Sequence, residues 1–293
     1  PLIAALVAAG GSIGIIIPPS IPMIIYGVST NTSIPGLFIG GYGPGILLGL
    51  GFMTLLWVIS RRKGYGGGGR LELNMLTSTF KRAFWALLAP VVIVGGIIFG
   101  IVTPTEAGVV GVIYTLAIGC LFMRTLSLKD IIESIDETVR LTGVVMFVVA
   151  VSGLLAWIMA REQIPQTFVT YALLHTSGAI MIVLLINVLL LILGAVMDTI
   201  AILIIALPVL VPIGAELGYD PIQFGVMVIF NLAIGMLTPP LGYCLFVSCS
   251  IANVSIGRAS LAILPFVAVS IAILMVVAFW PPLTLGLQGF LSW

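Results

Sequence analysis

Long apolar runs separated by short polar segments dominate the chain, and the first run is broken at its middle. Residues 2–28 are apolar except for a few small polar positions, and Pro18-Pro19 interrupts them. A membrane helix cannot continue through this pair, because each proline lacks a backbone N–H and its ring crowds the preceding turn. Such a break is tolerated in a membrane only where it is buried in protein or lines a wet cavity. The pattern therefore predicts two half-helices, 2–17 and 20–28.

The same interruption recurs near the other end of the chain. The segment from Ser12 to Pro19 matches the segment from Ala233 to Pro240 in spacing, so that Gly14 and Gly235 precede the two prolines by the same distance. Two interrupted apolar segments in corresponding places indicate the midplane site of a secondary transporter built from repeats. A single Pro-Pro is explained equally well as a packing kink, and the matched pair favours the site.

The other apolar runs have the lengths of membrane elements. About 20 apolar residues cross a bilayer, and the pattern predicts spans at 37–59, 84–102, 107–123, 142–160 and 259–280. The run 179–213 is too long for one span and is interrupted at Gly194 to Asp198. It predicts a re-entrant hairpin, in which two half-length helices meet at a tip near Asp198. The second broken helix is predicted over 222–250.

Three segments have an amphipathic pattern typical of helices that lie at the membrane surface. They are 71–84, 127–140 and, as a short interfacial helix, 165–174. One further local signal is Thr103-Pro-Thr-Glu106, which predicts a helix start with a capping box. The capping role of Glu106 is favoured over a role in proton relay.

Composition places the chain in the membrane class. Apolar residues make up 61%, charged residues 7%, and the mean hydropathy is +1.32, far from the values of soluble domains. The fold class is therefore an all-α integral membrane protein embedded in a lipid bilayer. The net charge of +1 gives no reason to expect a nucleic-acid partner. The sequence has no Ser/His, paired-Asp or His-Glu-x-x-His arrangement, so an enzyme is not expected.

The positions of the basic residues test the membrane topology that these elements predict. With the hairpin returning to its own side, Arg161 alone of the 11 basic residues falls on one side and the other ten fall on the opposite side. The positive-inside rule makes the basic side cytoplasmic. The second broken helix follows a hairpin, whereas the first begins at Pro1. We therefore expect the native chain to extend upstream and to contain a second hairpin there.

Several motifs together resemble the large membrane subunit of tripartite ATP-independent periplasmic (TRAP) transporters. They are Gly-Gly-Ser-Ile-Gly-Ile-Ile-Ile-Pro-Pro-Ser-Ile-Pro from Gly10, Thr-Pro-Thr-Glu-Ala from Thr103, Met197-Asp198 with Pro208, and Asn-Leu-x-Ile-Gly-x-x-Thr-Pro-Pro from Asn231. The family's first hairpin, with its Ser-Gly-Ser and Asp motif, has no counterpart here.

This resemblance implies a Na⁺-driven, inverted-repeat, elevator-type importer of an organic acid in the bacterial inner membrane. Its partners would be a soluble periplasmic substrate-binding protein and a small membrane subunit. The family takes C4-dicarboxylates, sialic acids and other organic acids, and the Gly-rich first motif reads closest to the sialic-acid branch. Two alternatives stay open: another Na⁺-coupled inverted-repeat carboxylate transporter, and a non-transporting membrane scaffold subunit. Paired helix breaks argue against the scaffold.

The domain organisation follows from these elements. Residues 1–35 would form the first broken helix of a transport domain, and 36–175 would form scaffold spans and amphipathic arm helices, some of which brace that domain. Residues 176–256 would add the hairpin and the second broken helix to the transport domain. Residues 257–293 would hold the last transmembrane span.

The predicted site residues lie at the breaks and at the hairpin tip. The C-terminal end of a half-helix carries partial negative charge on carbonyls that have no hydrogen-bond donor, and this charge suits a dehydrated Na⁺ ion. The expected sodium-binding residues are Gly14, Ile17, Gly194, Gly235 and Thr238. The half-helices that begin after the prolines direct positive N-termini at the midplane, where a substrate carboxylate would sit. Ser20 and Asp198 are the expected substrate-binding residues. The alternative role of Asp198 is to cap the second hairpin helix. Because Asp198 and the substrate are both negative, a contact between them requires Na⁺, water or hydroxyl groups in between.

Overall fold

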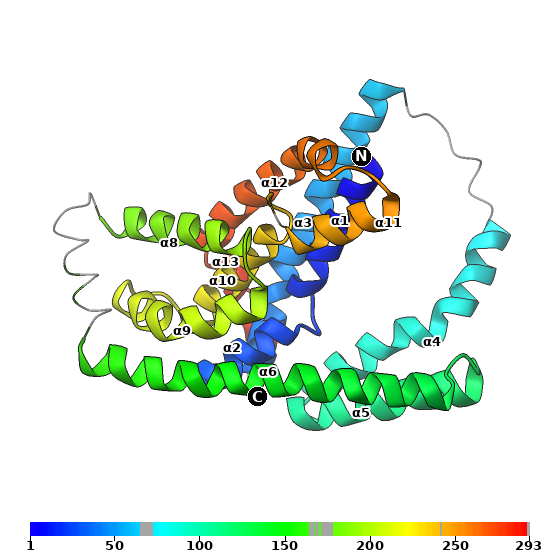
Figure 1. Ribbon diagram of the computed structural model, residues 1–293, viewed down its shortest axis with the longest axis horizontal. Helices are drawn as coiled ribbons and strands as arrows, with labels where there is room; N and C mark the ends of the chain where they lie inside the picture. Colours follow the sequence, from blue (N-terminus) through cyan, green and yellow to red (C-terminus); the bar gives the residue numbers. More distant parts are fainter. Residues whose placement is uncertain (65–72, 164–166, 168–169, 171–177, 241, 292–293) are drawn as a thin grey trace. The chain divides into compact units, whose positions relative to one another are not determined.

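The computed structural model describes the chain except for residues 65–72, 164–166, 168–169, 171–177, 241 and 292–293 (Figure 1). Every regular element in this described part is a helix. Five of the described helical segments are long and apolar enough to cross a membrane, namely Leu2–Thr30, Ile34–Lys63, Pro104–Phe122, Thr199–Glu216 and Ile256–Phe279. The prediction of an all-α membrane protein is confirmed. The helix predicted over 165–174 falls mostly outside the described residues.

Both broken helices form as the sequence predicted. The first consists of α1 (Leu2–Ile16) and α2 (Ile21–Thr30), and the second of α10 (Pro221–Gly235) and α11 (Tyr243–Ala252). The peptide bond between the two prolines is cis in each break. Because neither proline of a pair can donate a hydrogen bond, the helical ladder ends before each pair and a new helix begins after it.

The two broken helices run antiparallel to each other. Helix α1 packs against α11, and α2 packs against the beginning of α10. A Cβ on Gly11 would lie 3.4 Å from Sγ of Cys244, and one on Gly225 would lie 2.5 Å from the ring of Tyr26. The Tyr26 hydroxyl also donates to the carbonyl of Pro221 at 3.1 Å. The half before one break thus meets the half after the other, which is the arrangement that an inverted repeat requires.

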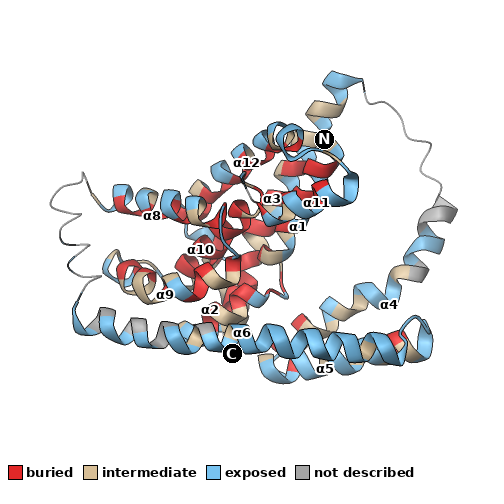
Figure 2. Cartoon of the chain, viewed as in Figure 1, coloured by how far each residue is buried: buried red, intermediate tan, exposed pale blue. Residues whose placement is uncertain are grey.

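The predicted hairpin is present as α8 (Ala179–Gly194) and α9 (Thr199–Glu216), joined by the turn 195–198. Helix α8 packs against α10, and α9 packs against both α10 and α2. Helix α10 is buried along nearly its whole length, from Gln223 to Gly235, and forms the centre of this part of the chain (Figure 2).

Helix α3 (Ile34–Lys63) and helix α12 (Ile256–Phe279) complete the packing around the breaks. Helix α12 contacts α1 and α10, and the short helices α13 (Pro282–Leu285) and η2 (Gln288–Leu291) follow it. Gly41 and Gly45 of α3 lie against Ile16 and Ile17, at the end of α1. A Cβ on Gly41 would lie 2.5 Å from the Ile16 carbonyl oxygen, so glycine is required for this close approach.

Residues Pro1–Leu56 and Val145–Trp293 form one compact unit, and Trp57–Val144 form another. Both broken helices, the hairpin, α12 and most of α3 belong to the first unit. The division of the chain into moving and stationary parts stays a prediction.

The second unit contains α4 (Leu73–Ile98), α5 (Pro104–Ala117) and the π-helix η1 (Ile118–Phe122). The capping box at the start of α5 is confirmed. The Thr103 N–H donates to Oε2 of Glu106 at 2.8 Å, and the Glu106 N–H donates to Oγ1 of Thr103 at 3.3 Å. The Glu106 carboxylate therefore satisfies a backbone donor at the helix start, which is the structural role favoured by the sequence.

The predicted break between a surface helix at 127–140 and a span at 142–160 is wrong. One continuous helix, α6, runs over the 34 residues Leu128–Arg161. The physical reason is that no proline lies within this range, so nothing interrupts the backbone hydrogen bonds where the pattern changes from amphipathic to apolar. At 1.5 Å per residue α6 is about 51 Å long, which exceeds the hydrocarbon thickness of about 30 Å.

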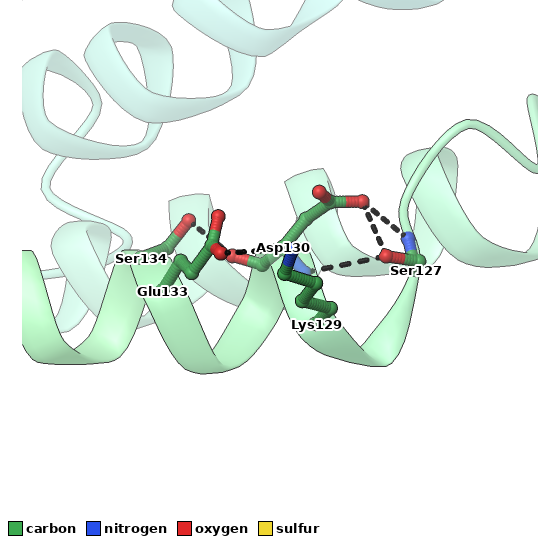
Figure 3. A network of polar contacts seen from close by, with 5 residues as sticks. All are labelled: Ser127, Lys129, Asp130, Glu133 and Ser134. Atoms are coloured by element: carbon green, nitrogen blue, oxygen red, sulfur yellow. Dashed lines mark hydrogen bonds and ion pairs between the residues drawn. The ribbon is translucent and has the colours of Figure 1, made fainter.

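The charged half of α6 is organised by a second capping box (Figure 3). The Ser127 N–H donates to Oδ2 of Asp130 at 2.8 Å and the Ser127 hydroxyl donates to the same oxygen at 2.6 Å. These hydrogen bonds lower the pKa of the Asp130 carboxyl. Lys129 and Glu133 form an exposed ion pair at 3.6 Å. Leu128, Ile132, Ile135 and Val139 are exposed as well, so this half of α6 keeps an apolar stripe beside a charged one.

Labelling tests on which side of the membrane this charged half lies. Leu128 to Arg140 account for about 20 Å of α6, which matches the excess of the helix over the hydrocarbon thickness. We expect cysteines in Glu133→Cys and Glu137→Cys variants to react with an impermeant maleimide from the cytoplasmic side only. Reaction in intact cells from the periplasmic side would contradict the predicted topology.

Candidate functional site

The hairpin tip and the second break meet in a backbone contact between two glycines. A Cβ on Gly235 would lie 2.6 Å from Cα and 2.7 Å from the carbonyl carbon of Gly194. A Cβ on Gly194 would lie 3.0 Å from Cα of Gly235. Position 235 therefore requires glycine, and a side chain at position 194 would crowd the same backbone contact. The structure brings together two of the predicted sodium-binding residues, which lie 41 positions apart (235 − 194) in the sequence.

The carbonyls before Pro239 find partners other than the usual helical donors. The Gly235 carbonyl accepts from the Thr238 N–H at 3.0 Å, and the Met236 carbonyl accepts from the Cys244 N–H at 3.2 Å. The Thr238 hydroxyl donates to the Ile234 carbonyl at 2.8 Å. A carbonyl oxygen has two lone pairs, and a hydroxyl that donates its proton keeps both of its own. Oxygen atoms that can still accept thus gather at the end of α10, next to Gly194.

The first break uses Ser20 to replace a lost donor. The Ser20 hydroxyl donates to the Ile15 carbonyl, which has no helical donor because Pro19 stands four residues later. The same oxygen accepts from the Met23 N–H at 3.5 Å as the N-cap of α2. The structure places Ser20 in the interior with its hydroxyl engaged across the break. Its predicted contact with substrate stays a prediction.

Gly14 and Ile17 occupy the same break. Gly14 is exposed, and a Cβ on it would meet no atom within 4 Å. Its carbonyl lacks the helical donor because the residue four positions later is Pro18. Ile17 caps α1 in an extended conformation, and its N–H still donates to the Ile13 carbonyl. Gly14 therefore presents an open backbone, in contrast to Gly235, which is covered by the hairpin.

Asp198 caps the second helix of the hairpin. One of its carboxylate oxygens accepts from the N–H groups of Ile200 and Ala201, at 2.9 and 3.2 Å. The side chain is exposed at the turn that follows Gly194. The alternative role raised by the sequence, a helix cap, is thus confirmed. This geometry uses one carboxylate oxygen and does not test the predicted contact with substrate.

A buried amide pair, which no sequence motif predicted, lies between α8 and α10 one to two helical turns before the glycine contact. Asn187 of α8 and Asn231 of α10 are 2% and 0% exposed. The Asn231 side-chain amide donates to both the carbonyl and Oδ1 of Asn187, at 2.9 and 2.8 Å. The available signal was composition, because Asn187 is the only polar residue in α8. A polar side chain within an apolar membrane helix is costly and commonly functional.

A cavity of about 340 Å³ lies at a different place, between the end of α2 and the start of α10. Hydroxyl-bearing side chains line it, including Tyr26, Thr30 and Ser33, together with Asp220. None of the seven predicted site residues lines this cavity. Residues of the loops 31–33 and 217–220 line it, and the charge pattern predicts that both loops lie on the same, periplasmic side. This neighbourhood agrees with the hairpin, since a single span over 179–213 would separate the two loops.

The fold and the site define a class of protein: a helical membrane transport subunit with discontinuous helices that meet in its interior. The family model described as "Tripartite ATP-independent periplasmic transporter, DctM component" matches residues 2–283. The chain belongs to this family of transporter permeases, and it is a membrane protein rather than an enzyme.

Three relatives illustrate the range of the family. The sialic acid TRAP transporter large permease protein SiaM of Vibrio cholerae is 40% identical over 280 residues, which are 96% of this chain and 66% of that protein. The isethionate TRAP transporter permease protein DctMQ of Oleidesulfovibrio alaskensis is 39% identical, over 98% of this chain and 45% of that protein. The C4-dicarboxylate TRAP transporter large permease protein DctM of Pseudomonas aeruginosa is 36% identical, over 99% of this chain and 68% of that protein. The chain therefore spans between about half and two thirds of the length of these relatives.

Proposed function

We propose that the chain is part of a Na⁺-coupled importer of an organic acid that works by an elevator mechanism. The observation that carries the proposal is the pair of antiparallel broken helices, one of which meets the hairpin tip at Gly194 and Gly235. Half-helices that end in the membrane interior provide oxygen atoms for cations and N–H groups for anions in one place. A non-transporting scaffold subunit would need neither.

The residues at the second break fit a Na⁺ ion. A hard cation prefers oxygen ligands. Thr238 bonds to the Ile234 and Gly235 carbonyls, and Gly235 contacts the backbone of Gly194. In the described part of the chain, no cluster of three His, Cys, Asp or Glu side chains would offer a different metal site. Gly14 and Ile17 would serve a second ion at the first break. When bound, Na⁺ would supply positive charge next to an anionic substrate.

The substrate is proposed to be an organic anion. The names of three relatives specify sialic acid, isethionate and C4-dicarboxylates, all of which carry negative charge at neutral pH. The N-termini of α2 and α11 would attract such an anion through the positive ends of their helix dipoles. Ser20, at the start of α2, and Asp198, at the hairpin tip, are the proposed substrate-side residues. Asp198 would act through Na⁺, water or hydroxyl groups because of its charge.

Two partners complete the proposal. A soluble periplasmic substrate-binding protein would deliver the acid, and a small membrane subunit would hold the large one in the bacterial inner membrane. The compound name DctMQ of the isethionate relative supports the small subunit. Another Na⁺-coupled carboxylate transporter architecture is no longer needed as an alternative, since the family is shown.

Uptake into proteoliposomes tests this function. The full-length transporter, with its small subunit and substrate-binding protein, is reconstituted and offered radiolabelled sialic acid, succinate or isethionate under an inward Na⁺ gradient. We expect uptake of at least one acid that is lost when K⁺ replaces Na⁺. Uptake that is equal in Na⁺ and K⁺ would contradict Na⁺ coupling. Absence of uptake of every acid in this panel would contradict the proposed substrate class.

Removal of one hydroxyl tests the second cation site. Thr238→Val keeps the shape of the side chain and removes one oxygen ligand, so the Na⁺ concentration for half-maximal uptake should rise about tenfold, equivalent to about 1.4 kcal/mol. Thr30→Val is the matched control, because the Thr30 hydroxyl makes the same bond to the carbonyl four residues earlier, at 2.7 Å. An unchanged Na⁺ dependence in Thr238→Val would exclude Thr238 as a ligand.

A further inference from the structure

The amide pair Asn187–Asn231 lies on the same seam between α8 and α10 as the glycine contact. Asn187 precedes Gly194 by seven residues, and Asn231 precedes Gly235 by four. These separations are close to two turns and one turn of an α-helix, so each asparagine faces the same way as its glycine. The seam therefore carries one polar contact between side chains and, one to two turns further on, one contact between backbones.

The hydrogen bonds of the pair are directional and nearly complete. The Asn231 Nδ2 donates twice to Asn187, and the Asn187 Nδ2 donates to the Val183 carbonyl at 2.8 Å and approaches Sδ of Met227 at 3.6 Å. The remaining oxygen, Oδ1 of Asn231, is buried and has no hydrogen-bond partner among the described residues. A buried acceptor without a partner is destabilising.

Stability alone does not explain the pair. Leucine is close to asparagine in size, and leucines at both positions would remove every buried acceptor of the amide pair and add apolar contacts. An amide pair instead permits only those positions of two helices in which donor meets acceptor, as buried asparagines do when they fix the register of coiled coils. Apolar side chains at the same positions would tolerate sliding of α8 along α10.

We propose that Asn187 and Asn231 are positioning residues that set the register of the hairpin against α10. They thereby fix the distance between the backbones of Gly194 and Gly235 and the placement of oxygen atoms around Thr238. We call this amide contact, which fixes the register of α8 against α10, the lock. It acts at the second break only, because the residue that corresponds to Asn231 in the first break, 221 positions earlier, is Gly10. This inference rests on the Na⁺ coupling proposed above.

The test compares thermal unfolding of the purified full-length transporter in NaCl and in KCl at equal ionic strength. A ligand that binds the folded state raises the unfolding temperature as its concentration rises. The dependence of this rise on Na⁺ gives the dissociation constant of the cation site without any substrate. We call this constant the half-effect Na⁺ concentration, since half of the sites are occupied there. In Asn231→Leu we expect a lower unfolding temperature in KCl, because the buried Oδ1 of Asn187 loses the donor that Asn231 provides. We expect the half-effect Na⁺ concentration to rise about tenfold.

Further variants separate positioning from simple stability. Asn187→Leu should raise the half-effect Na⁺ concentration as Asn231→Leu does, and the double variant should be no worse than either, because both act through one contact. Gln223→Leu is the matched control: this buried amide of α10 donates to the Val277 and Ala278 carbonyls of α12, and it lies about three turns before Gly235. It should lower the unfolding temperature and leave the half-effect Na⁺ concentration unchanged. If Asn231→Leu does not fold, Asn231→Ala is measured in the same way.

The outcomes distinguish this inference from the proposed function. A wild-type protein whose unfolding temperature rises equally in NaCl and KCl contradicts Na⁺ coupling, and the inference falls with it. A wild-type protein with a Na⁺-specific shift, together with asparagine variants of unchanged half-effect concentration, contradicts the lock and leaves the coupling in place. A shift in Gln223→Leu as large as in Asn231→Leu also contradicts the lock.

Discussion

Replacement of Gly235 by alanine should strongly reduce Na⁺-driven uptake. The added methyl group would lie 2.6 Å from Cα and 2.7 Å from the carbonyl carbon of Gly194. A side chain could relieve such a clash by changing its rotamer, but backbone atoms cannot. Helix α10 and the hairpin tip must therefore separate. Overpacking of this kind costs about 1–3 kcal/mol. If this cost opposes Na⁺ binding, the Na⁺ affinity falls by about 5- to 150-fold. Uptake at a fixed Na⁺ gradient measures the effect.

Two glycine controls make the result for Gly235→Ala specific. Gly49→Ala in α3 adds a methyl group where nothing lies within 4 Å, so uptake should be normal and stability unchanged or higher. Gly225→Ala crowds the ring of Tyr26 at 2.5 Å, and we expect it to lower stability without a Na⁺-specific defect. Normal uptake by Gly235→Ala at normal expression would show that the glycine contact has no part in transport.

Asp198→Asn should reduce Na⁺-driven uptake by more than about tenfold while the protein stays folded. Asparagine caps helices about as well as aspartate, so the bonds from the Ile200 and Ala201 N–H groups are kept. The variant loses only the negative charge at the hairpin tip. Interactions of a charged group are worth about 1.5–3 kcal/mol, or roughly 10- to 150-fold in affinity. The measurement is initial uptake rate together with the unfolding temperature of the purified variant.

The matched control is Asp220→Asn, because Asp220 caps α10 in the same way. One of its carboxylate oxygens accepts from the N–H groups of Ile222 and Gln223, at 2.8 and 3.3 Å, and its side chain is exposed as well. We expect Asp220→Asn to leave uptake unchanged. If Asp198→Asn transports normally, Asp198 is a helix cap only, and the site in this half of the chain consists of Gly194, Gly235 and Thr238.

The sequence by itself determined the membrane class, both broken helices, the hairpin and the capping box at Thr103, and its motifs pointed to the family. These features depend on local causes: apolar run length, the missing N–H of proline and the short reach of a capping side chain. Two predicted boundaries are absent, at 84 inside α4 and between 140 and 142 inside α6, because no proline stands where the amphipathic pattern changes to an apolar one. A change of environment is not by itself a change of backbone conformation.

Only the tertiary structure decided which residues meet. Gly194 was predicted at a tip and Gly235 at a break, but their backbone contact depends on how α8 crosses α10, which no local pattern specifies. Ser20 turned out to bond across its own break, and Asn187 and Asn231 became a pair because two helices, 44 positions apart at these residues (231 − 187), share one seam. Hydrophobic periodicity shows which face of a helix is buried. The partner of that face, and the register in which the two pack, follow from side-chain packing and directional hydrogen bonds between distant segments.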